Sequence, residues 1–303
     1  MSRHDDHESE ALGRFTTAAE SAAGDIIRVY STSFGMATRL LGSRHRQHVR
    51  NIYAMVRIAD EIVDGAAAGA GLAPRLVAAE LSAYEQATNT AMHRGYSTDP
   101  VLHAFGRTAL SVGIDETLTA PFFASMRADA EGAGHDGVTT VFDGERRERY
   151  VYGSAEVVGL MCLRVFLAGE HRTRSQLDAL EHGARQLGAA FQNANFLRDV
   201  ADDTDRLGRD YLAGRSRLTD ADRDFWVATV RRQLDDAARA IPLLPKDCRA
   251  AVRCAHGLFT ALADRVERVS AAELYRRRVR VPDAVKLVTA ARALVHTARE
   301  RRS

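Results

Sequence analysis

The chain has 303 residues, of which 46% are hydrophobic and 27% are charged, and its formal net charge is +2. This composition is ordinary for a globular protein, and the near balance of charge argues against a nucleic-acid partner. The three cysteines are odd in number and form no CxxC pair, which argues against a disulfide framework or a zinc site and favours a reducing, cytoplasmic compartment.

The first twenty residues form a polar segment of mixed charge that begins MSRHDDHESE. This segment lacks the apolar centre of a signal peptide, so residues 1–20 are expected to be a disordered tail. Between residues 21 and 300 no linker is long enough to separate domains, and a single domain is expected there. No run of roughly 20 apolar residues is found, so no membrane-spanning segment is expected.

Apolar residues recur at helical spacing through most of the remaining chain. One helix is predicted from about His48 to Asp64, where Gly65 ends it, and another begins at Pro74. Only DGVTTVFD, residues 136–143, suggests a short extended piece, so the predicted fold class is all-α. The later helical patterns are, in order, PVLHAFGRTALSVG, APFFASMRADAEG, RRERYVYGSAEVVGLMCLRVFLAG, RSQLDALEHGARQLGAAFQNANFLRDVADDTDRLG, DADRDFWVATVRRQLDDAARAI, KDCRAAVRCAHGLFTALADRVERV and PDAVKLVTAARALVHTARE.

Two of the predicted helices carry an acidic stripe. In RIADEIVDGA, Asp60 and Asp64 lie four residues apart, and Arg57 precedes them by one turn. Residues at this spacing share one helix face. The second stripe, in FQNANFLRDVADDTDRLGRDYL, consists of Gln192, Asn195, Asp199 and Asp203.

A single carboxylate pair of this kind is usually a solvated helix face, because like charges at this spacing destabilise a helix by only about 0.2–0.5 kcal/mol. Two such pairs, each preceded on its own face by an arginine or an amide, favour a functional interpretation. Mg²⁺ prefers a few carboxylates together with water and substrate phosphates. Arginine and asparagine at the same level suit diphosphate oxygens. Two facing stripes would hold Mg²⁺ around a diphosphate and stabilise it as a leaving group.

Four segments together resemble the squalene/phytoene synthase family, the head-to-head prenyl synthases of the all-α isoprenoid-synthase fold. YSTSFGMATRLL, from Tyr30, resembles the Ser-x-Ser-Phe segment of the family, and NIYAMVRIADEIVDG, from Asn51, resembles its first aspartate motif. YVYGSAEVVGLM, from Tyr150, resembles its central tyrosine/glycine motif, and the segment from Phe191 resembles its second aspartate motif. The similarity covers about residues 26–290 and is strongest to bacterial phytoene synthases. It implies a helical bundle with a central active-site cavity over residues 21–300.

The resemblance also implies roles for individual residues. The four aspartates Asp60, Asp64, Asp199 and Asp203 match catalytic metal ligands, Asn195 matches a further metal ligand, and Tyr152 matches a catalytic residue of the pocket. The residues that match substrate-binding positions are Ser31, Ser33, Arg57, Gln192, Asn195, Arg198, Arg209 and Tyr211. Without the resemblance, the two serines would be read as N-cap or loop residues, and Tyr152 as a core aromatic with a bonded hydroxyl.

Two features remain open in the sequence. Glu156 stands where the family usually has a small residue, and its carboxylate would either face the cavity or pair with an arginine. The basic cluster RRRVRV, residues 276–281, is interpreted as a solvated helix end, with a role in membrane contact or product exit as the alternative.

The implied reaction is the condensation of two geranylgeranyl diphosphates to phytoene through a cyclopropyl diphosphate intermediate, with release of diphosphate. One alternative is a squalene or presqualene diphosphate synthase that acts on farnesyl diphosphate. Another is a non-catalytic scaffold of the same fold, although a scaffold has no reason to retain all four aspartates.

The expected cofactor is Mg²⁺, with Mn²⁺ as an alternative. NADPH is not expected, because no recognisable dinucleotide-binding motif is present. The expected partners are prenyl diphosphate substrates, without an obligatory protein partner. The expected location is the cytoplasm, with peripheral contact at the inner face of the membrane.

Overall fold

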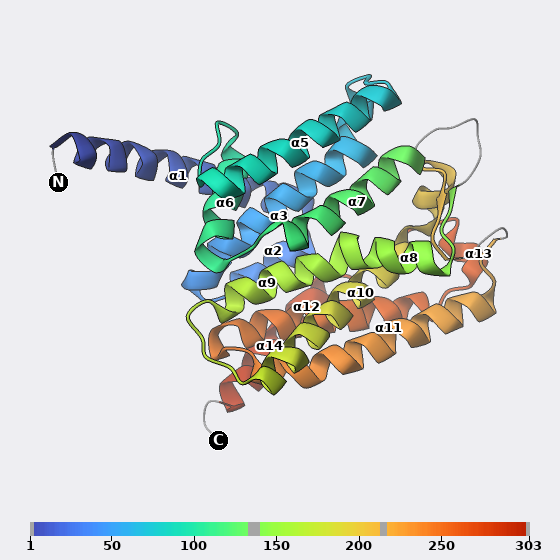
Figure 1. Ribbon diagram of the computed structural model, residues 1–303. Coiled ribbons are helices and arrows are strands. Elements are labelled where there is room, and N and C mark those ends of the chain that lie inside the picture. The colour runs from blue at the N-terminus through green and yellow to red at the C-terminus, as the bar shows by residue number, and fades with distance from the viewer. Residues whose placement is uncertain (1–2, 133–139, 213–216, 301–303) are drawn as a thin grey trace.

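The computed structural model describes residues 3–132, 140–212 and 217–300, and most of these residues are helical (Figure 1). The predicted all-α class is therefore confirmed. The helices are α1 (Arg3–Tyr30), α2 (Thr32–Arg39), α3 (Ser43–Asp64), α4 (Ala66–Gly69), α5 (Pro74–Arg94), α6 (Pro100–Val112), α7 (Glu116–Gly132), α8 (Gly144–Val151), α9 (Val157–Leu167), α10 (Arg174–Asp205), α11 (Asp220–Ala240), α12 (Lys246–Val266), α13 (Ala271–Leu274) and α14 (Asp283–Glu300). A π-helical turn, Tyr152–Glu156, joins α8 to α9, and a 3₁₀ turn, Ile241–Leu243, follows α11.

The helix that carries the first acidic stripe ends where the sequence predicts. The last residue of α3 is Asp64, and the N–H of Gly65 donates a hydrogen bond to the Glu61 carbonyl at 3.3 Å. Pro74 is the first residue of α5, also as predicted. The start of α3 differs from the prediction, because the helix begins at Ser43 rather than near His48.

A two-stranded parallel sheet links two distant parts of the chain. Strand β1 (Thr140–Val141) pairs with strand β2 (Arg209–Asp210), with Thr140 opposite Arg209. Thr140 and Val141 confirm the predicted extended piece, while residues 136–139 lie outside the described residues. Since β2 comes directly after α10, the sheet fixes the residues that follow the second acidic stripe.

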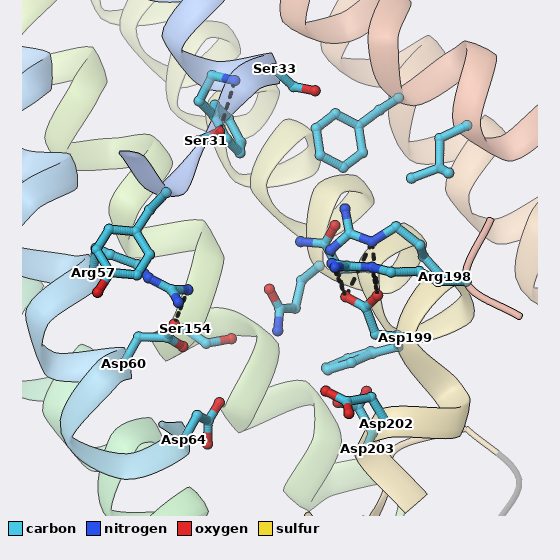
Figure 2. Close-up of a pocket in the computed structure, with 18 of the residues that line it drawn as sticks. Ser31, Ser33, Arg57, Asp60, Asp64, Ser154, Arg198, Asp199, Asp202 and Asp203 are labelled. Atoms are coloured by element: carbon cyan, nitrogen blue, oxygen red, sulfur yellow. Dashed lines mark hydrogen bonds and ion pairs between the residues drawn. The ribbon is translucent and has the colours of Figure 1, made fainter. Parts of the chain in front are cut away.

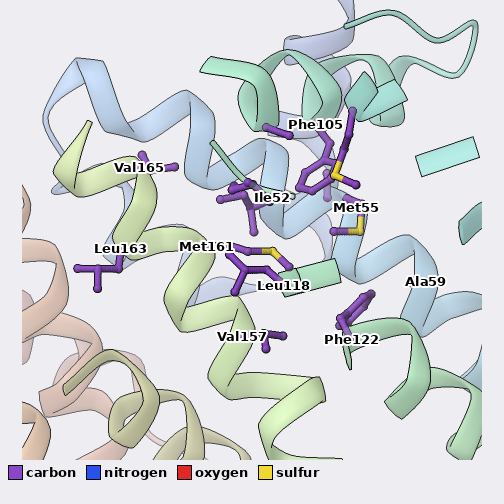
Figure 3. Close-up of a cluster of buried hydrophobic side chains, with 14 of the residues drawn as sticks. Ile52, Met55, Ala59, Phe105, Leu118, Phe122, Val157, Met161, Leu163 and Val165 are labelled. Atoms are coloured by element: carbon purple, nitrogen blue, oxygen red, sulfur yellow. The ribbon is translucent and has the colours of Figure 1, made fainter. Parts of the chain in front are cut away.

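The buried apolar side chains form two main clusters on either side of α10. The larger cluster joins α3, α5, α6, α7 and α9. Figure 3 shows its centre, where residues of α3, α6, α7 and α9 converge. The second cluster joins α10, α11, α12 and α13. The carboxyl-terminal half of α10 packs in this second cluster. This packing places the acidic stripe of α10 opposite α3.

Close helix crossings around the π-helical turn depend on glycine. A Cβ added at Gly188 of α10 would lie 2.5 Å from the Ala155 carbonyl oxygen, and one at Gly153 would lie 2.2 Å from the Pro121 carbonyl oxygen. The Ser125 hydroxyl donates to the Tyr150 carbonyl at 3.1 Å, so α7 satisfies a carbonyl next to the turn. Such π turns often occur at functional sites.

The prediction of a disordered tail is wrong for the described part of residues 1–20, because α1 is helical from Arg3. Ala19 and Ala23 are fully buried, and the Phe15 ring packs against the His103 ring at 4.8 Å. The Thr16 hydroxyl lies 2.9 Å from His103 Nε2. These residues recur at helical spacing, so they continue the apolar face of α1 toward the N-terminus. Figure 1 shows the first part of α1 extending away from the other helices.

One continuous helical stretch, Gly144–Leu167, is long and apolar enough to cross a membrane by length and composition, contrary to the sequence expectation. Its packing explains its composition. The turn and α9 contact α3, α7 and α10, and Val157 and Met161 are fully buried. This stretch is therefore a core helix of the bundle, and its apolar residues face other helices.

Candidate active site

A cavity of about 1070 Å³ opens between α3 and α10. Figure 2 shows its acidic part, with Asp60 and Asp64 on one side and Asp199, Asp202 and Asp203 on the other. Of the predicted site residues, all but Tyr152 line this cavity: Ser31, Ser33, Arg57, Asp60, Asp64, Gln192, Asn195, Arg198, Asp199, Asp203, Arg209 and Tyr211.

Arginines neutralise three of the four predicted metal-binding aspartates. Arg57 donates to both Asp60 and Glu61, which follow it by three and four residues on the same face of α3. On α10, Asp199 accepts from the neighbouring Arg198, with Nε–Oδ1 at 3.0 Å. A second cation, Arg278, reaches Asp199 from the segment between α13 and α14, with Nε–Oδ1 at 2.6 Å. This segment thus closes one side of the acidic site.

Asp64 is bound by an arginine that is itself held by a buried carboxylate. Arg209 Nη1 donates to Asp64 Oδ1 at 2.6 Å, and Arg209 Nη2 donates to the Asp129 carbonyl at 2.9 Å. The Asp129 carboxylate pairs with Arg209 Nη1 at 3.4 Å, and it accepts from the hydroxyl of Tyr150 at 2.7 Å and from that of Tyr211 at 2.8 Å. Asp129 and Arg209 are each only 1% exposed. This network connects α3, α7, α8 and β2 at the floor of the acidic site.

Burial and the nearby carboxylates raise the pKa values of two aspartates in the site, Asp60 and Asp203. Burial, together with repulsion from the carboxylates of Asp199 and Asp64, raises the pKa of Asp203 to about 8. Burial likewise raises the pKa of Asp60 to about 7, with repulsion from Asp64 as the next cause. No arginine of the described residues forms an ion pair with Asp203. The site therefore concentrates negative charge that its own arginines balance only in part.

These residues fit divalent cations of the Mg²⁺ class. Such cations prefer oxygen ligands, and the two acidic stripes supply carboxylates from opposite sides. Asn195 adds a carbonyl-type oxygen, since its Oδ1 is buried and lacks a hydrogen-bond partner within the described residues. A buried amide oxygen without a partner is costly unless a ligand satisfies it. The donor set and the charge imbalance thus both agree with the predicted metal ligands.

The rest of the cavity wall is largely apolar and aromatic. It includes Phe122 and Met126 of α7, Phe196 of α10, and Leu258, Phe259 and Leu262 of α12. Phe259 stacks on Phe191 with ring centroids 3.8 Å apart, and both rings contact Phe34. An acidic mouth above an apolar interior suits a ligand with a charged head and a long hydrocarbon tail.

The two predicted serines lie where α2 begins. Ser31 is the N-cap of α2, and its hydroxyl accepts from the Phe34 N–H at 3.1 Å. Both Ser31 and Ser33 also line the cavity, as Figure 2 shows. The capping role expected from the sequence alone and the cavity position implied by the resemblance are thus both observed for Ser31.

The prediction for Tyr152 is not supported, because this residue does not line the cavity. Its ring packs against Arg185 of α10, with the guanidinium carbon 5.3 Å from the ring centroid. The π-helical turn instead directs Ser154 into the cavity, with Tyr150 beside it. Glu156 pairs with Arg185 at 2.7 Å and is absent from the cavity wall, which decides the question left open by the sequence.

Sequence reasoning missed several residues of the site. Asp129 gave no signal, because it is one of three acidic residues in α7 and belongs to no spaced motif. Arg278 belongs to the basic cluster that was interpreted as a helix end, and this interpretation is wrong for Arg278, which contacts Asp199 from a loop. Ser154 contributes a buried hydroxyl that has no partner among the residues described. Further cavity residues that were not predicted include Tyr30, Asp202, Arg206 and Lys286.

Comparison with known proteins places these features in a family. The squalene/phytoene synthase family model matches residues 27–284. The chain is similar to a bifunctional lycopene cyclase/phytoene synthase of Phycomyces blakesleeanus, with 28% identity over 293 residues that cover 84% of this chain and 46% of that protein. The chain therefore spans about half the length of that relative. It is also similar to a phytoene synthase of Mycobacterium tuberculosis, with 28% identity over 289 residues that cover 89% of this chain and 88% of the relative.

Among solved structures, the fold is similar to that of a dehydrosqualene synthase in complex with a ligand. The TM-score is 0.74 at 22% identity, covering 94% of this chain and 98% of the other. This likeness agrees with the predicted helical bundle. Because the family model matches most of the chain, including both acidic stripes, the protein belongs to the squalene/phytoene synthase family.

Proposed function

We propose that this protein is a prenyltransferase that condenses two prenyl diphosphates head to head. The observation that carries the proposal is the pairing of two acidic stripes, on α3 and α10, across the mouth of one apolar-lined cavity. The acidic part suits the diphosphate heads with their cations, and the apolar part suits the hydrocarbon tails. The names of the similar proteins agree with this reaction class.

The residues that would hold Mg²⁺ are Asp60, Asp64, Asn195, Asp199 and Asp203. When bound there, Mg²⁺ would neutralise diphosphate charge and make diphosphate a better leaving group. Arg57, Arg198 and Arg278 now pair with carboxylates of the same site, which keeps three guanidinium groups where the substrate heads would lie. Guanidinium groups bind phosphate oxygens with two parallel hydrogen bonds.

The apolar wall would protect the carbocations of this reaction. Phe122, Phe196 and Phe259 place aromatic rings in the cavity, and the faces of such rings attract cations. The wall also excludes water, which would otherwise quench a cation prematurely. The chain supplies few polar groups here, of which the Ser154 hydroxyl is one.

We propose two geranylgeranyl diphosphates as substrates and phytoene as the product, formed through a cyclopropyl diphosphate without NADPH. Support comes from the similar proteins that are named phytoene synthase. The reaction yields an apolar product, so the protein is proposed to act in the cytoplasm at the inner face of the membrane.

The test is to incubate the purified protein and Mg²⁺ with C20 or C15 prenyl diphosphate and to identify the products by mass. The proposal expects phytoene from the C20 substrate, with no need for NADPH. Turnover of the C15 substrate alone would replace phytoene with a squalene-type product. A product seen only after NADPH is added would overturn the non-reductive ending, and no turnover of either substrate would favour the scaffold alternative.

A further inference from the structure

An apolar stripe on the outer face of α14 has no partner among the described residues. The exposed fractions of its largest side chains are 62% for Leu287, 49% for Val288, 48% for Leu294 and 52% for Val295. They recur at helical spacing, so they form one face. The opposite face packs on α12, where Ala293 and Thr297 are buried. A shallow groove runs along the outer face between Val288 and Glu300.

The segment around this stripe is strongly basic. Residues 275–303 contain nine Lys and Arg but only two acidic residues, although the whole chain has a net charge of only +2. The remainder of the chain is therefore net negative, and the positive charge is concentrated at this end. The exposed arginines on or just before α14 include Arg276, Arg280, Arg292 and Arg299.

The stripe is continuous with the mouth of the cavity. Val279, Val281 and Pro282, which lead into α14, line the cavity, as does Lys286 in its first turn. Leu287 directly follows Lys286 and begins the exposed stripe. The segment before α14 therefore joins the cavity mouth to the helix that carries the exposed stripe.

We propose that α14 docks this face onto an anionic lipid bilayer, with the stripe among the acyl chains and the arginines at the headgroups. Helices that lie in a membrane interface combine an apolar face with flanking basic residues in this way. A second copy of the chain is not expected to cover this face, because two such basic faces would repel each other. Anionic headgroups would instead attract them, and more weakly as salt rises.

The experiment measures binding of the full-length protein to sedimented vesicles, without substrate. One set of vesicles is phosphatidylcholine alone, and the other also contains phosphatidylglycerol. The test variants are L287S/V295S, which removes apolar area, and R292E/R299E, which reverses charge. The matched controls are L110S, at an exposed leucine of α6, and R232E, at an exposed arginine of α11. Circular dichroism confirms that every variant is folded.

We expect the wild type to bind the anionic vesicles preferentially and to be released by salt. Each test variant should bind roughly tenfold more weakly or worse, while both controls bind like the wild type. Equal binding by all proteins, or no wild-type binding, would overturn the proposal. So would sedimentation velocity that shows a dimer lost only in L287S/V295S, since a second copy would then cover the face. Because no substrate is present, these outcomes are independent of the proposed reaction.

Discussion

Asp60 and Asp199 hold equivalent places on the two sides of the acidic site. Each is the first aspartate of its stripe, and each is paired with an arginine at the cavity wall. Replacing either aspartate with asparagine keeps the size of the side chain but removes the charge that a divalent cation requires.

We expect Asp60→Asn and Asp199→Asn each to lower kcat/KM by roughly 100-fold or more, because the leaving diphosphate loses its electrostatic stabilisation. Steady-state kinetics over a range of Mg²⁺ concentrations provide the measurement. Asp178→Asn, at an exposed residue near the start of α10, is the matched control and should leave kcat/KM unchanged. Near-normal activity of Asp60→Asn at limiting Mg²⁺ would contradict the assigned metal site.

The raised pKa values of Asp60 and Asp203 make stability depend on pH. Both carboxyl groups start from an ordinary value of 3.8 and rise to about 7 and about 8 in the folded protein. Between these values the folded state binds more protons than the unfolded chain, so stability falls as pH rises through this window. Without divalent cations, the melting temperature should therefore be higher at about pH 5 than at about pH 9, as far as these groups are concerned.

Mg²⁺ should restore stability at the higher pH, because it compensates the same repulsion that protonation relieves. Thermal melts of the wild type and Asp203→Asn, with and without Mg²⁺, provide the measurement. Asp203→Asn should be more stable than the wild type at high pH without metal and should gain less from Mg²⁺. A wild type that melts identically at both pH values and ignores Mg²⁺ would show that the carboxylates are not crowded in solution.

At the scale of the elements, the short strand β2 is held in place by Asp129 of α7. Removing one partner of a buried ion pair typically costs about 3–5 kcal/mol. Asp129→Asn should lower the free energy of unfolding by an amount near this range, since Arg209 would lose its buried counter-charge. Activity should fall as well, because Arg209 also positions Asp64.

Tyr150→Phe provides the graded comparison, since it removes only one hydrogen bond to Asp129. Its cost should be about 1 kcal/mol. Urea unfolding and the Mg²⁺ concentration for half-maximal activity are the two readouts. If Asp129→Asn cost no more than Tyr150→Phe and left the Mg²⁺ requirement unchanged, the network would not hold Arg209 in the way described.

At the scale of the whole molecule, α1 has an outer part that extends away from the bundle and an inner part that packs on it (Figure 1). Residues 8–14 are exposed, whereas Ala19 and Ala23 are fully buried. A chain lacking residues 1–12 should keep its melting temperature and activity. A chain lacking residues 1–23 should lose about 3 kcal/mol or more of stability, because it loses buried side chains. Equal melting temperatures of the two truncated chains would contradict this division of α1.

Much of the architecture was predictable because it rests on local patterns. Helical periodicity with capping glycine and proline located α3, α5 and the later helices, and the end of α3 at Asp64 agreed with the structure. The four aspartates were recognisable for the same reason, since residues four apart share a face of one helix. The tail was misjudged because the apolar residues that anchor α1 are mostly alanines, which carry little hydrophobic signal.

The pairing of the two acidic stripes across one cavity depends on how α3 and α10 pack. No local sequence pattern determines the distance between these two helices. The same holds for Asp129, whose partners come from α8 and from β2 with the residue after it. It also holds for Arg278, which reaches Asp199 from the α13–α14 segment. Tyr152 shows the limit most clearly, because a π-helical turn rotates the residues around it and places Ser154 at the cavity. Local sequence thus decides which helices form and which residues share a face, whereas long-range packing decides which faces meet.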